Sequence, residues 1–273
     1  MERWQIKQID KDVIRWGNSA GVLLPREWLG NQVKVILIDR TLEIKKEVFN
    51  ILDKYLEDII GVYLVGSYAR REEEENSDID VIAISKSTKK EIISGRYNIS
   101  IITLKGAEKT IERNPVLILP RLNEAKVILN SYLLEELKSI KFQKNAFKEF
   151  IEESKRIIKI SKSFITIDRD QEYKNLDSIS IIYSLILRLR GIFLIRNILN
   201  KEKYSKKEFL RWMNKEIDSN EIERVYNVYT SIRDDKKVKE KIKIETAEKL
   251  LNFLEKEVPK LENETKKKIG KRS

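Results

Sequence analysis

The chain contains neither cysteine nor histidine among its 273 residues. Without cysteine, disulfides, iron–sulfur clusters, thiolate zinc sites and cysteine nucleophiles are excluded. Without histidine, the Ser/His and Cys/His catalytic pairs cannot be built. Any metal must therefore be held by oxygen ligands, which points to Mg²⁺ or Mn²⁺.

Long apolar runs are missing too. The most apolar stretch, Ile179 to Leu187, ends at Arg188 and Arg190 after too few residues to span a bilayer, and no apolar segment follows a basic start. We therefore expect a cytoplasmic protein with no membrane partner. The composition is 36% charged and 41% hydrophobic, rich in Ile, Lys and Glu, which is typical of a soluble globular protein and leans toward hyperthermophile usage.

The net charge of +11 is unevenly distributed along the chain. Residues 1–47 carry a net +2 and residues 48–130 a net −1, whereas residues 131–273 carry 34 basic and 24 acidic side chains, a net +10. A polyanionic partner should therefore interact most strongly with the C-terminal half.

The hydrophobic pattern predicts a multidomain protein of four parts. Residues 1–47 read as a small β-rich unit, with short alternating runs at 5–9, 22–24 and 33–38. Residues 131–259 have helical spacing and predict an α-helical bundle. Residues 260–273 are lysine-rich with almost no apolar content, so we expect a disordered basic tail.

Residues 48–130 predict an α/β domain with a mixed sheet. The pattern predicts helices at 48–60 and 87–94, and strands at 62–65, 79–84 and 98–104.

One motif in this α/β segment indicates chemistry. Gly66-Ser67 is followed ten residues later by Asp78-x-Asp80, and apolar strands flank both. Carboxylates two residues apart on a strand point to the same side, so both can reach a divalent metal. Gly66 lets the backbone approach a phosphate, Ser67 can donate a hydrogen bond to it, and Arg70 or Arg71 can neutralise its charge. Asp-x-Asp alone is usually only solvated.

This pattern, over about 45 residues, resembles the DNA polymerase β-like nucleotidyltransferase superfamily in its minimal form. The resemblance implies an NTP substrate bound by Gly66, Ser67, Arg70 and Arg71, with Mg²⁺ (or Mn²⁺) held by catalytic Asp78 and Asp80. Relatives usually carry a third carboxylate on the next strand, where this chain has no acid and Asn98 or Ser100 occupies the position. The acidic run 72–75 reads as a solvated loop.

The N-terminal segment Ile14-Arg15-Trp16-Gly17-Asn18-Ser19 resembles the AbrB/MazE-type swapped-hairpin DNA-binding domains, over about 40 residues. That resemblance implies a homodimer, because one copy is too short to bury its own core. It also implies DNA contacts at Arg15 and Asn18, although Leu23 stands where relatives often have a second arginine. A dimerisation unit without DNA binding is the alternative.

The C-terminal half looks loosely like helical domains that accompany such transferases, including HEPN-like ones. The Arg-x(4–6)-His signature of HEPN ribonucleases is impossible without histidine. Arg188, Arg190 and Arg196 could line a nucleotide or substrate cleft, or form a solvated face. The leading hypothesis is thus a metal-dependent nucleotidyltransferase with an unknown acceptor. The alternative is a DNA-binding regulator or antitoxin-like protein whose transferase domain binds nucleotide without catalysis.

Overall fold

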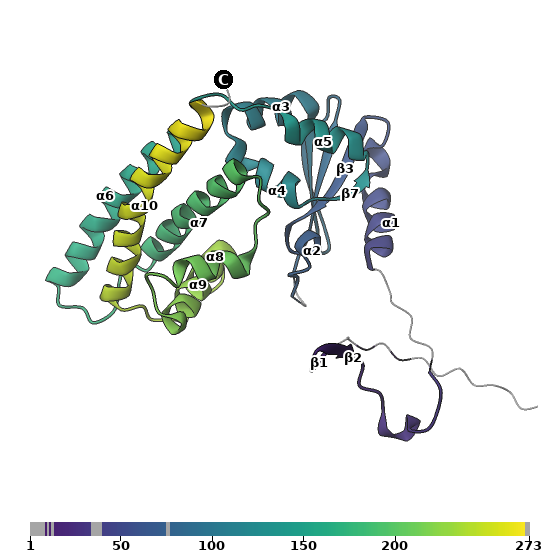
Figure 1. Ribbon diagram of the computed structural model, residues 1–273, viewed down its shortest axis with the longest axis horizontal. Helices are drawn as coiled ribbons and strands as arrows, with labels where there is room; N and C mark the ends of the chain where they lie inside the picture. The colour runs from purple at the N-terminus through teal and green to yellow at the C-terminus, as the bar shows by residue number, and fades with distance from the viewer. Residues whose placement is uncertain (1–8, 10, 12–13, 34–39, 75–76, 271–273) are drawn as a thin grey trace, which may run out of the picture. The chain divides into compact units, whose positions relative to one another are not determined.

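The computed structural model describes residues 9, 11, 14–33, 40–74 and 77–270 (Figure 1). Contacts between residues divide the chain into two compact units, residues 1–44 and residues 45–273. The predicted α/β and helical parts therefore belong to one unit, and each unit is described below by itself.

The N-terminal unit contains one antiparallel hairpin, formed by β1 (Ile14–Trp16) and β2 (Ser19–Gly21). Gly17 lies in the turn with φ of 58°, a conformation that favours glycine. The short 3-10 helix η1 (Arg26–Trp28) follows Pro25. The strand predicted at 22–24 is wrong, since strand pairing ends at Gly21. The strands predicted at 5–9 and 33–38 lie outside the described residues, apart from one residue of each.

Helix α1 (Arg40–Leu52) and the 3-10 helix η2 (Asp53–Tyr55) lead into a mixed five-stranded sheet of order β5-β6-β4-β3-β7. Strands β4 and β6 run parallel, and every other pair is antiparallel. The mixed sheet was predicted correctly. Its strands are β3 (Ile59–Val65), β4 (Ile79–Ser85), β5 (Lys90–Ser94), β6 (Tyr97–Thr103) and β7 (Lys126–Leu129).

The helix predicted at 87–94 is wrong, because most of this segment is β5. Its short apolar pair, Ile92 and Ile93, fits a helix or a strand equally well. The two-residue turn at Gly95-Arg96, with Gly95 at φ of 57°, folds β5 back onto β6 as a hairpin.

One face of the sheet is covered by short helices that follow β6 and β7. These are α3 (Leu104–Arg113), η3 (Pro115–Leu117), α4 (Leu119–Glu124) and α5 (Ser131–Ser139), whereas the short helix α2 (Gly66–Arg70) directly follows β3. Tyr63, Ile82 and Ile84 of the sheet share a buried cluster with Ile111 of α3 and Leu134 of α5. Because α5 packs on the sheet, the α/β part extends past the predicted boundary at residue 130.

The remaining helices form the predicted bundle. They are α6 (Lys148–Asp170), α7 (Ser180–Asn200), α8 (Lys206–Met213), α9 (Ser219–Arg233) and α10 (Ile244–Gly270). Helix α7 is central and contacts α6, α9 and α10, with Leu185, Leu189 and Ile192 fully buried (Figure 1). No helix in the described ranges is both long and apolar enough to cross a membrane.

The disordered tail predicted from residue 260 is wrong as far as residue 270, because α10 continues to Gly270. Leu261, Thr265 and Ile269 are buried at helical spacing, so the lysines between them occupy the solvent side of an amphipathic helix. The high lysine content of this segment led to the prediction of disorder, although its few apolar residues lie at helical spacing.

Leu261→Ala should therefore destabilise the protein. The side chain is 0% exposed, and truncating such a leucine costs about 2 to 5 kcal/mol of unfolding free energy. Urea denaturation measures the loss, with Lys267→Ala on the exposed side as control, where the change should stay within about 0.5 kcal/mol. Equal effects of the two substitutions would contradict the packed helix.

Candidate active site

The Gly66-Ser67 motif forms the sharp turn from β3 into α2. Val65 is still extended, whereas Gly66 has φ of 74°. A Cβ atom on Gly66 would lie 2.5 Å from Oδ2 of Asp80, closer than a Cβ approaches an oxygen, so the carboxylate would have to move. Glycine is therefore required twice, by its backbone conformation and by the carboxylate packed against it.

Asp80 lies at the start of β4, opposite Val65 of β3 and next to Asn98 of β6. Asp78 is exposed just before the strand, two residues away, whereas Asp80 is half-buried. Burial raises the pKa of Asp80 and the nearby charge of Asp78 raises it further, whereas Arg121 lowers it. The structure thus places Asp80 against the Gly66 turn, with the charge of Asp78 close enough to act on it.

Positive charge reaches Asp80 from three elements. After Arg121 of α4, the cations that lower its pKa are Arg70 of α2 and Arg233 at the end of α9. Arg121 and Arg233 belong to no recognisable sequence motif, and only the fold brings them close to Asp80. Arg71, by contrast, ends α2 in the left-handed conformation at φ of 61° with an exposed side chain.

Glu124, at the end of α4, was missed in the sequence and holds the motif in place. Its carboxylate accepts a hydrogen bond of 2.9 Å from the Gly66 N–H and two of 2.9 Å from Nη1 of Arg70. Its side chain is only 5% exposed. Burial raises the pKa of Glu124, while Arg70 opposes that effect. No spacing rule links residue 124 to residue 66, so only the fold identifies it.

An amide, that of Asn98, stands where relatives usually carry the third carboxylate. Asn98 pairs with Asp80 in the parallel register, so their side chains share one face. Ser100, the other predicted occupant, pairs with Ile82 and donates a 2.7 Å hydrogen bond to Glu91 of β5. Among the residues that the structure describes, no three acidic side chains gather into a metal-binding group.

The three arginines of α7 have different surroundings. Arg188 forms an ion pair with Glu153, and Arg196 forms ion pairs with Glu257 and Glu264, so both stabilise the bundle. Arg190 instead lies 5.1 Å from the ring centre of Tyr204, and its charge lowers the pKa of Glu124. Of the three, Arg190 is the one whose charge acts on Glu124, the carboxylate bonded to the Gly66 N–H.

Tyr204 links the bundle to the motif. Arg70 lies 5.3 Å from the centre of the Tyr204 ring, which Arg190 also contacts. Glu72 forms a 2.8 Å ion pair with Arg70 and accepts hydrogen bonds from the Ser205 hydroxyl and the Lys206 N–H, at the start of α8. The interpretation of Glu72 as solvated is therefore wrong, although Glu73 and Glu74 are exposed.

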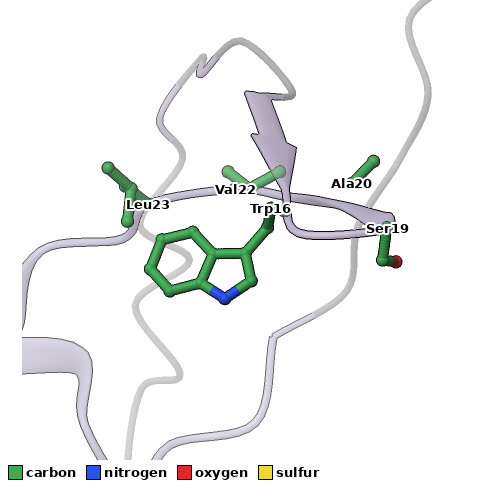
Figure 2. Close-up of a pocket in the computed structure, with 6 residues that line it drawn as sticks. Trp16, Ser19, Ala20, Val22 and Leu23 are labelled. Carbon is green, nitrogen blue, oxygen red and sulfur yellow. The ribbon is translucent and has the colours of Figure 1, made fainter.

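The residues predicted to bind DNA lie in the N-terminal hairpin. Arg15 is exposed on β1, where its Nε donates to the Gly17 carbonyl at 3.2 Å, and Asn18 is exposed in the turn. Figure 2 shows the indole of Trp16 beside Leu23 at a shallow hollow. Trp16 is 63% and Leu23 58% exposed, so large apolar side chains are exposed among the residues of this unit that the structure describes.

The comparisons with known proteins agree with this geometry. The family model for polymerase beta nucleotidyltransferases matches residues 46–163, which include the whole sheet and the motif. A protein of Methanocaldococcus jannaschii, named provisionally as a protein adenylyltransferase, is 34% identical over 146 residues, which are 50% of this chain and 99% of that protein.

Two solved structures are similar at lower identity. A spectinomycin adenyltransferase of Enterococcus faecialis, crystallised with ATP and spectinomycin, is 17% identical, with 80% of this chain and 99% of that chain covered and a TM-score of 0.41. A nucleotidyltransferase-like protein of Exiguobacterium sibiricum is 15% identical, with 83% and 78% covered and a TM-score of 0.31.

Removal of the Glu124 carboxylate should be costly. Glu124→Ala leaves Arg70 and the Gly66 N–H without their acceptor, and breaking a buried ion pair from one side costs about 3 to 5 kcal/mol. Glu124→Gln keeps an oxygen for the Gly66 N–H and should lose less. Urea denaturation measures both, with the exposed Glu112→Ala of α3 as control. A Glu124→Ala protein as stable as the control would contradict this role.

Proposed function

Since this chain belongs to the polymerase beta nucleotidyltransferase family, we propose that it transfers a nucleoside monophosphate from an NTP to a hydroxyl group. One observation carries the proposal: the Asp80 carboxylate packs directly against the Gly66 turn that would receive the phosphates. The name of its archaeal relative favours ATP as the donor and a protein hydroxyl as the acceptor.

In this reaction the acceptor oxygen forms a bond to the α-phosphorus and the bond from that phosphorus to the bridging oxygen breaks. Pyrophosphate leaves, and the hydroxyl proton is released to water. Gly66 allows the chain to approach the phosphates, and Ser67 at the start of α2 donates to a phosphate oxygen. Arg70 and Arg190 offset triphosphate charge, because both lie on the Tyr204 ring beside the turn. Arg71 is the more peripheral cation.

The residues present fit a divalent cation. Asp78 and Asp80 offer carboxylate oxygens, Asn98 offers an amide oxygen on the same face, and oxygen is the donor that Mg²⁺ and Mn²⁺ prefer. Burial of Asp80 and the nearby charge of Asp78 both raise the pKa of Asp80, and a bound cation would offset both effects. When bound, the cation supplies positive charge to the phosphate oxygens.

Transfer of labelled nucleotide tests the proposal. With α-labelled ATP, Mg²⁺ or Mn²⁺ and cell extract, the wild-type chain should label an acceptor. Asp78→Asn and Asp80→Asn should lose at least about 100-fold in rate, because charge stabilisation at the reacting phosphate is lost. Asp170→Asn, an exposed aspartate of α6, is the matched control.

The outcome also separates the two classes of function. Wild-type protein that binds ATP but transfers no label supports the alternative, a regulator whose transferase domain senses nucleotide without catalysis. Label transfer that survives both asparagine substitutions would show that these carboxylates are not catalytic. Excess chelator should abolish transfer of the label, and added Mg²⁺ should restore it.

We further propose that the N-terminal unit forms a homodimer and contacts DNA through Arg15 and Asn18. The observation that favours the dimer is the set of uncovered apolar side chains in so small a unit. These are Ile14, Trp16, Leu23, Leu24, Leu29 and Val33, between 39% and 78% exposed.

Arg15→Ala separates DNA binding from dimerisation. The full-length variant should bind duplex DNA more weakly, with a salt dependence lower by about one phosphate contact, because the guanidinium neutralises a phosphate. Its mass by light scattering should remain that of two chains. Arg26→Ala in η1 is the control. If Arg15→Ala binds DNA as tightly as the wild type, or if the wild type does not bind DNA, the DNA contact is contradicted and only dimerisation is left. A wild-type protein that is monomeric contradicts dimerisation as well.

A further inference from the structure

Strand β5 (Lys90–Ser94) is the edge of the sheet beside β6, and its outer side is open within residues 45–273 as far as they are described. Four of its five residues are exposed, and only Ile92 is half-buried. An open strand edge presents unpaired N–H and C=O groups, which another extended chain can pair with.

The hairpin register identifies which backbone groups face outward. The two-residue turn Gly95-Arg96 makes Ser94 and Tyr97 a hydrogen-bonded pair. In an antiparallel ladder such pairs alternate with non-bonded ones, so Ile92 bonds to β6 while Glu91 and Ile93 direct their N–H and C=O groups away from it. No backbone bond from Glu91 or Ile93 to another described residue is present outside the ladder.

The outward-facing residues are aligned with the reaction site. Asp80 pairs with Asn98 and Asn98 pairs with Ile93, so these three residues form one row across β4, β6 and β5. Their side chains share a face, and Ile93 is 81% exposed. Ile93 therefore lies about 10 Å, two strand spacings, from Asp80, on the side opposite the Gly66 turn in β3.

The other face of β5 offers a second feature. Ile51 of α1 and Tyr55 of η2 line a shallow hollow with Ile92. The Lys90 ammonium closes one side, where it donates a 2.7 Å hydrogen bond to the Tyr55 hydroxyl and lies 5.3 Å from the ring centre. A strand added to β5 would place alternate side chains at this hollow and beside Ile93.

We propose that β5 docks an extended segment of the acceptor protein, paired to the backbone of Glu91 and Ile93. The regular spacing of N–H and C=O groups along the edge matches that of an extended polypeptide, and the hollow offers a position for one of its apolar side chains. To bring a hydroxyl side chain to Asp80, the segment would leave the edge and cross the row formed by Ile93 and Asn98. The identity of this segment as the acceptor rests on the proposed function, whereas strand addition itself does not.

Proline at position 93 tests strand addition. Ile93→Pro removes the outward N–H without breaking the β6 ladder, since proline is tolerated where an edge N–H faces solvent. Ile93→Ala keeps the N–H and removes the side chain, so it is the matched control. Random peptides of about ten residues, displayed and selected on the full-length wild type, are the probe. The best peptide should bind Ile93→Pro about tenfold or more weakly than Ile93→Ala.

Amide exchange resolved to single residues gives an independent readout in the unchanged protein. The peptide should slow exchange at Glu91 and Ile93, while Ile92, already bonded to β6, should change little. Circular dichroism should show the same fold for both variants. A selection without binders, a peptide that binds both variants equally, or unchanged exchange at Glu91 and Ile93 would overturn the proposal, as would a second copy of this chain that occupies β5 in place of the peptide.

Transfer onto the selected peptide, extended at either end by serine, threonine and tyrosine, then tests its role as acceptor. Labelling that falls with Ile93→Pro while ATP affinity is unchanged supports an acceptor docking site. Exchange protection without labelling of any protein or peptide would leave strand addition intact and count against the transferase. Labelling of the peptide that is equal in both variants would place acceptor docking elsewhere.

Discussion

The buried carboxylate of Glu124 is the contact on which the site depends. It fixes the Gly66 N–H and Arg70 at once, and so joins the end of α4 to the turn between β3 and α2. A carboxylate this buried is stable only with such partners, and its bond to the Gly66 N–H holds the turn in place. The contact of Gly66 with Asp80 and the stacking of Arg70 on Tyr204 both follow from this arrangement.

The site has two sides that meet at Asp80. On one side lie the Gly66 turn, Arg70 and the bundle residue Arg190, a cationic and aromatic environment suited to phosphate. On the other lie Asn98 and the exposed Ile93, which are neutral. The neutral amide of Asn98 stands where relatives usually carry a third carboxylate, so the departure from the family pattern lies on the neutral side of Asp80.

The sequence predicted the motif, the mixed sheet and the bundle because these depend on local spacing and periodicity. It missed Glu124, which bonds to Gly66, and Arg233, which acts on Asp80, because packing between segments remote in the sequence brings them there. The helix predicted at 87–94 was wrong for another reason. So short an apolar pair fits a helix or a strand equally well, and pairing with β6 selects the strand. For residues 260–270, composition concealed three buried side chains at helical spacing. The swapped-hairpin interpretation of the N-terminal unit remains a prediction.

Glu72 gives the site a thermodynamic consequence beyond its geometry. The same carboxylate pairs with Arg70 and accepts hydrogen bonds from the first residues of α8. A triphosphate that draws Arg70 toward itself would compete with Glu72 for the guanidinium. Because Glu72 also bonds to the start of α8, this competition would affect the contact between the motif and the bundle. Under the proposed function, nucleotide affinity and the contact of Glu72 with α8 would be coupled, and the coupling free energy would be the same in both directions.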